Sequence, residues 1–203
     1  MATAAIEHHH PVHAAHPPTA TGLNTWKVGF WVFMGSETLF FGSLISVYMV
    51  YKGTSVVGPF PSDVFDTALT SISTFVLLMS SLAVVLALDF LNAGRRFLAL
   101  FWTMAIIVLG AMFLGFQAYE FTHFYHEGLT LGTNIFGSSF FVLTGFHGAH
   151  VTIGVIWLLM LWLDMFRGKL RPENSLRLEI AGLYWHFVDI VWIAIFTLIY
   201  LME

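Results

Sequence analysis

A glutamate stands inside an apolar stretch long enough to cross a membrane. Glu37 lies in GFWVFMGSETLFFGS, with large apolar side chains on both sides. An ionised carboxylate at membrane depth costs several kcal/mol unless it is paired or hydrated, so we expect Glu37 to be a neutral carboxylic acid. Such a group could be part of a proton relay, or it could be a regulatory carboxyl. It could equally bridge two helices, because a protonated carboxyl both donates and accepts hydrogen bonds, and we favour the bridging interpretation.

Two histidines share one face of a second apolar stretch. His147 and His150 lie three residues apart in GFHGAHVTIG, among glycine, alanine and threonine. Residues at this spacing project from the same side of a helix, and small neighbours let another helix approach closely. The pair could ligate a metal or a haem. No third ligand of suitable type follows nearby, so we favour hydrogen bonding across helices.

A second polar pair lies in LEIAGLYWHFVDIVWIAIF, where His186 and Asp189 are again three residues apart. At 1.5 Å per residue they lie roughly 14–18 Å beyond Arg177, and Glu37 lies roughly 15 Å into its own stretch. Similar depths make a cluster of Glu37, His186 and Asp189 geometrically feasible. Glu179 is close in sequence to Arg177, and we interpret it as a charged residue at the membrane interface.

Five apolar stretches hold these side chains, and each exceeds the ~20 residues that a membrane-spanning helix needs. Composition agrees, because 58% of the 203 residues are apolar and 10% are charged, against about 25% charged residues in soluble domains. The sequence therefore predicts an all-α integral membrane protein, a bundle of five transmembrane helices within residues 27–202. The spans are 27–51, 66–91, 96–119, 136–165 and 178–202.

Charge and cysteine usage exclude several other functions. The net charge is −4 with only 8 Lys and Arg, which argues against nucleic acid as a partner. The chain has no cysteine, so disulfides, thiolate metal sites and cysteine nucleophiles are excluded. The GxSxG, Walker A and GxGxxG signatures are also absent.

Basic residues gather in two of the loops, after the second and fourth spans. The loop between the third and fourth spans carries no cation and, on these boundaries, contains Glu120. The positive-inside rule then predicts a cytoplasmic N-terminus and an external C-terminus. The cations that decide this are Lys27, Arg95, Arg96, Arg167, Lys169, Arg171 and Arg177.

Residues 1–26 form a separate segment, rich in histidine and proline. We expect a disordered cytoplasmic tail, although its histidines could bind a metal ion. These are His8, His9, His10, His13 and His16.

Three strings resemble subunit III of the haem–copper terminal oxidases, a family that includes cytochrome c oxidases and quinol oxidases. They are GFWVFMGSETLFFGS, GFHGAHVTIGVIW and LYWHFVDIVWIAIFTLIYLM, and the spans fit the five-helix bacterial form. The resemblance implies a non-catalytic accessory subunit without its own cofactor, with haem and copper in partner subunits. It implies direct binding to subunit I, association with subunit II and a candidate small subunit IV, and bound phospholipid. It also implies support for oxygen access and proton uptake in a bacterial inner (plasma) membrane.

The resemblance also implies which residues of this chain correspond to the family's functional positions. Glu37 matches the family's buried, carbodiimide-reactive carboxyl. Arg167 is the candidate for binding a lipid headgroup, although longer relatives place that arginine where this chain has Asp164. The remaining matches belong to the FHG-x-H and E-x4-YWHFVD motifs: His147, His150, Glu179, Trp185, His186 and Asp189.

Three alternatives stay open. One is a subunit-III-like accessory protein of a nitric oxide reductase system. Another is a small di-haem cytochrome that uses His147, His150 and His186 as axial ligands. The third is a proton-coupled transporter that uses Glu37. Within the oxidase interpretation, the sequence leaves the electron donor open between cytochrome c and quinol.

Overall fold

The computed structural model describes residues 25–54, 58 and 67–202, and this part of the chain is helical without strands. The long helices are α1 (Thr25–Tyr51), α3 (Thr67–Asn92), α4 (Arg96–His126), α5 (Ile135–Phe166) and α6 (Leu176–Phe196). A 3-10 turn, η1 (Pro172–Asn174), precedes α6, and a π-helical segment, η2 (Thr197–Leu201), continues it. All five long helices are long and apolar enough to cross a membrane, so the predicted five-helix fold class is confirmed.

When η2 is counted with α6, four of the five spans lie within two residues of the predicted bounds, and α4 is the exception. It continues seven residues past position 119, to His126. The polar and aromatic residues after Tyr119 lower the hydropathy but contain no helix breaker. The helix ends where Gly128 adopts a φ of +83°, a conformation that L side chains rarely adopt. Placing Glu120 in a loop was therefore wrong.

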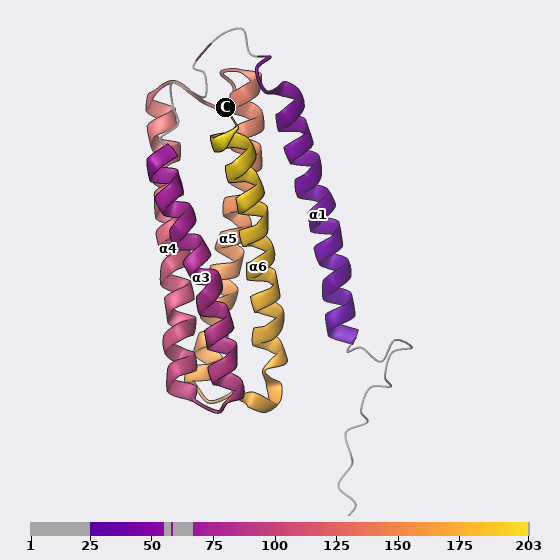
Figure 1. Cartoon of the computed structure of the whole chain (residues 1–203), viewed down its shortest axis with the longest axis vertical. Coiled ribbons are helices and arrows are strands. Elements are labelled where there is room, and N and C mark those ends of the chain that lie inside the picture. Colours follow the sequence, from indigo (N-terminus) through magenta and orange to yellow (C-terminus); the bar gives the residue numbers. More distant parts are fainter. Residues whose placement is uncertain (1–24, 55–57, 59–66, 203) are drawn as a thin grey trace, which may run out of the picture.

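Helices α3 to α6 pack side by side, whereas α1 lies apart from them at its N-terminal end (Figure 1). About 11% of the apolar core of α1 is buried, against 28–56% in the other four helices. Its buried residues are Met34, Phe41 and Tyr48, one every seven residues. This spacing gives a narrow seam, as in a coiled coil, so most of the surface of α1 faces outward.

One tryptophan forms the centre of the four-helix part. Trp185 of α6 is fully buried, and its Nε1 donates to the Ser80 hydroxyl of α3 at 2.8 Å. A Cβ atom placed on Gly110 of α4 or Gly154 of α5 would lie within 3 Å of the indole ring. The two glycines therefore leave the space that the ring occupies, and the single side chain ties four helices together.

Polar contacts connect both ends of α1 to the last part of the chain. At one end, Lys27 Nζ lies 2.6 Å from Glu179 Oε1 of α6. At the other end, Lys52 donates to the carbonyl oxygens of Leu198 and Met202. The start of α1 and the loops after α3 and α5 lie at the same end of the molecule (Figure 1), which we call the basic end.

Candidate functional site

Glu37 pairs with a histidine on α5. Its Oε2 lies 3.3 Å from Nε2 of His150, and both side chains are mostly buried. The other ring nitrogen of His150, Nδ1, lies 2.8 Å from the carbonyl oxygen of Phe146. Because a carbonyl oxygen only accepts, Nδ1 carries a hydrogen. The Glu37–His150 contact therefore shares one further proton, and the pair is neutral as a whole whether this proton sits on oxygen or nitrogen.

This contact replaces the cluster of Glu37 with His186 and Asp189 considered from the sequence. Depth along a helix gives the height of a residue but not the direction of its side chain. The buried seam of α1 packs against α5, and the ring centroids of Phe41 and His150 are 4.9 Å apart. That packing turns Glu37 toward α5, which is why His150 is its partner.

His147 has different surroundings from His150, although the two share a helix face. Its ring is fully buried and stacks on Trp192 of α6, with centroids 4.8 Å apart. The edge of Phe113 meets the same ring at 5.8 Å. Within the described residues, neither ring nitrogen of His147 makes a hydrogen bond. The expected hydrogen bonding across helices thus holds for His150, whereas His147 is part of an aromatic core.

The pair His186 and Asp189 meets α3 instead of α1. Nδ1 of His186 lies 2.6 Å from the Ser81 hydroxyl. The Asp189 carboxyl is buried near the same serine, and within the described residues neither of its oxygens makes a hydrogen bond. The Ser81 hydroxyl is therefore bonded to the imidazole and lies near a buried carboxyl inside the bundle.

A second buried carboxyl was missed by the sequence analysis. Glu120 of α4 is only 5% exposed, and the Thr70 hydroxyl of α3 donates to its Oε1. Tyr200 of η2 is buried close to this pair. Three elements, α3, α4 and η2, therefore meet around one carboxyl.

A periodic signal in the sequence could have revealed this second carboxyl. The buried positions of α4 continue at spacings of three and four residues across the predicted end of the span. They are Phe113, Gln117, Glu120 and Phe124.

At the basic end, the charged side chains form pairs between helices. Glu179 pairs with Lys27, as described above, and Arg177 lies 2.8 Å from Asp164. Asp164 of α5 therefore holds an arginine of α6. Arg167 is exposed at the end of α5.

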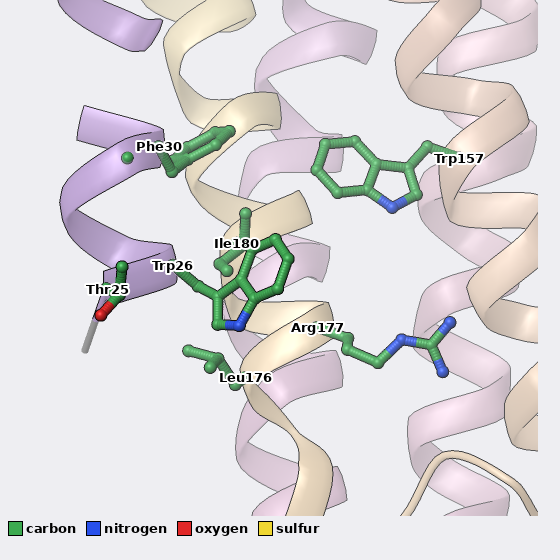
Figure 2. Close-up of a pocket in the computed structure, with 8 residues that line it drawn as sticks. Thr25, Trp26, Phe30, Trp157, Leu176, Arg177 and Ile180 are labelled. Atoms are coloured by element: carbon green, nitrogen blue, oxygen red, sulfur yellow. The ribbon is translucent and has the colours of Figure 1, made fainter. Parts of the chain in front are cut away.

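An apolar groove of about 750 Å³ opens beside these pairs, between α1, α5 and α6. Trp26 and Phe30 line it from α1 and Trp157 from α5, with Ile180 of α6 between them (Figure 2). Among the described residues that line it, Arg177 is the charged one, and Arg167 is not part of this lining. The groove is therefore apolar, and the Arg177 side chain, which is paired with Asp164, lies at its basic end.

Metal ligation was the other chemistry considered for the histidines. In the described part of the chain, no group of three or more histidine, aspartate and glutamate side chains could hold a metal ion. His147 and His150 do not converge, and His186 faces a serine. The histidines of residues 1–24 lie outside the described residues, so metal binding there stays a prediction.

Comparisons with known proteins give one consistent result. The sequence profile of the family described as cytochrome c oxidase subunit III matches residues 6–203. The chain is 41% identical over 175 residues to quinol oxidase subunit 3 of Bacillus spizizenii, covering 86% of each chain. Quinol oxidase subunit 3 of Bacillus subtilis shows the same identity and coverage. A probable quinol oxidase subunit 3 of Staphylococcus saprophyticus is 39% identical over 180 residues, covering 88% of this chain and 90% of the relative.

Proposed function

Because the chain belongs to the cytochrome c oxidase subunit III family, we propose that it serves in a haem–copper oxidase that takes its electrons from quinol. It is an accessory subunit of such an oxidase, a multi-pass membrane protein that performs no catalysis by itself. The observation that supports quinol is the 41% identity to two quinol oxidase subunits over 86% of the chain. The same comparisons favour an oxidase subunit over the cytochrome and transporter alternatives.

The reacting cofactors belong, in this proposal, to partner subunits. Haem and copper are held by subunit I and its neighbours, and this chain binds subunit I directly. Subunit II and a small subunit IV complete the complex. The described residues of this chain support that division, because its membrane histidines contact an acid, a serine and aromatic rings.

We place the basic end in the cytoplasm of a bacterial cell, with the protein in the plasma membrane. Lys27, Arg96 and Arg177 all lie at this end, and cytoplasmic loops carry an excess of lysine and arginine. The C-terminal end of η2 then lies on the external side. Relatives from Bacillus and Staphylococcus support the bacterial location.

Phospholipid fills the groove between α1, α5 and α6 in this proposal. Arg177 is the headgroup cation that the geometry supports best, because it lines the groove, and Arg167 is the weaker candidate. A cation near a cytoplasmic leaflet attracts lipid phosphate by about 1 kcal/mol. Glu37 is the carboxyl that hydrophobic carbodiimides modify, since it lies in the apolar part of α1 next to His150.

Purification of the intact complex through a tag on this chain tests the proposal. We expect a haem subunit and a copper-binding subunit to co-purify, together with the visible spectrum of haem. We expect oxygen consumption with quinol and none with reduced cytochrome c. Turnover with cytochrome c alone would assign the other electron donor, and nitric oxide reduction without oxygen consumption would favour the nitric oxide reductase alternative. A chain that purifies alone, coloured by haem or colourless, would refute the accessory role.

A further inference from the structure

A second groove lies between α1 and α6, with a volume of about 360 Å³. Trp31 and Met34 line it from α1, and His186 and Phe187 line it from α6. Two other lining side chains carry a polar group. Thr38 donates its hydroxyl to the Met34 carbonyl in its own helix, and the indole N–H of Trp31 can only donate. Among the lining residues, His186 is therefore the side chain that can both donate to and accept from a ligand.

His186 lies too deep for a phospholipid headgroup. It is ten residues into α6, which starts at Leu176, and this distance corresponds to about 15 Å along the helix axis. The hydrocarbon core of a bilayer is about 30 Å thick, so the imidazole lies near its middle. A ligand that uses His186 must bring a neutral hydrogen-bonding group to that depth. Acyl chains carry none, whereas the ring of a quinol or quinone does.

The contact between His186 and Ser81 suits both oxidation states of such a ring. Nδ1 of the imidazole faces the serine hydroxyl at 2.6 Å, and a hydroxyl can donate or accept. When the serine donates to Nδ1, Nε2 carries the hydrogen and can donate to a quinone carbonyl. When Nδ1 donates to the serine, Nε2 accepts from a quinol hydroxyl. Neither arrangement places a net charge in the apolar groove.

We infer that the groove between α1 and α6 binds the ring of a membrane quinol or quinone, with one ring oxygen hydrogen-bonded to Nε2 of His186. Trp31 and Phe187 supply aromatic surface for the flat ring. The inference rests on the proposed function, in which quinol is the electron donor. It adds a binding site in the accessory subunit, apart from the site in which partner subunits oxidise quinol.

The test uses the intact oxidase complex and a photoreactive azido-quinone. After illumination and proteolysis, mass spectrometry locates the label in each subunit. We expect label in residues 30–38 and 183–190 of this chain, in addition to label in the catalytic subunit. An excess of decylubiquinone should displace the label from both places.

Variants of the groove make the test specific. His186→Phe should weaken labelling of the groove roughly two- to tenfold, as the loss of one hydrogen bond implies. His186→Gln should retain most of it, because an amide both donates and accepts. Gly35→Phe should abolish labelling by filling the groove, since a Cβ at Gly35 meets no atom within 4 Å; this variant keeps the test possible if the His186→Phe complex fails to assemble. Phe97→Leu, at an exposed position of α4 that lines neither groove, is the control and should leave the labelling unchanged.

Two outcomes would overturn the inference while leaving the proposed function intact. One is a complex that oxidises quinol but carries no label in residues 30–38 and 183–190. The other is label that survives unchanged in both His186→Phe and Gly35→Phe, or that phospholipid displaces and decylubiquinone does not. A complex without quinol oxidation would instead contradict the proposed function.

Discussion

The packing of Trp185 against two glycines predicts a sharp difference between alanine substitutions on one helix. In Gly110→Ala, the new Cβ would lie 2.6 Å from Cη2 of Trp185, about 1 Å short of the 3.5–4.0 Å at which carbon atoms attract best. The ring cannot move away easily, because Gly154 closes its other side and Nε1 is bonded to Ser80. Overpacking of this kind costs about 1–3 kcal/mol.

Gly115→Ala is the matched control, because an added Cβ there meets no atom within 4 Å. Both substitutions gain the higher helix propensity of alanine, up to ~1 kcal/mol, and this gain cancels in their difference. We therefore expect Gly110→Ala to be less stable than Gly115→Ala by about 1–3 kcal/mol. The measurement is the free energy of unfolding of the purified chain, from SDS titration in mixed micelles followed by tryptophan fluorescence.

The same two alanine substitutions in a Trp185→Phe variant test whether the clash involves the indole ring. Trp185→Phe removes the part of the ring that approaches Gly110, so in this background Gly110→Ala should lose most of its cost. Equal stabilities of Gly110→Ala and Gly115→Ala would refute the packing argument. So would a cost of Gly110→Ala that stays the same after Trp185→Phe.

Three further predictions concern side chains near the two carboxyls and the lipid groove. Glu37→Gln should abolish modification of the chain by a hydrophobic carbodiimide, measured as a mass shift; modification that persists would point to another carboxyl, and Glu120→Gln is the comparison. Glu120→Ala should destabilise the chain by about 1–3 kcal/mol in the same SDS titration, because it leaves the Thr70 hydroxyl without its acceptor. Arg177→Gln should lower the retained anionic phospholipid about fivefold in native mass spectrometry, as the loss of about 1 kcal/mol implies. Arg167→Gln should retain it, and an equal loss in both variants would contradict the role of the groove.

Hydropathy and helical spacing in the sequence were enough to predict the helices. The five spans were found because each needs a long apolar run, and long runs are unambiguous. The position of Gly128, not hydropathy, decides where α4 ends. A hydropathy boundary therefore placed Glu120 outside the helix and hid a buried carboxyl.

Side-chain partners depend on how helices rotate against each other, and one sequence does not contain this information directly. Glu37, His186 and Asp189 have similar depths, yet the seam of Phe41 and Tyr48 turns Glu37 toward His150 on α5. The spacing of His147 and His150 correctly predicted that both side chains project from the same face of the helix. It did not predict that the ring of His147 would stack on Trp192. Such choices follow from the packing of large side chains in three dimensions.

The polar contacts of α1 have a consequence for the order of events during biosynthesis. Lys27 in α1 and Lys52 directly after it are translated before their partners Glu179, Leu198 and Met202. The two ends of α1 can therefore be fixed only after α6 has been inserted, whereas the contact of Glu37 with His150 of α5 can form earlier. A chain truncated before α6 would hold α1 through its middle but leave both lysines without these partners.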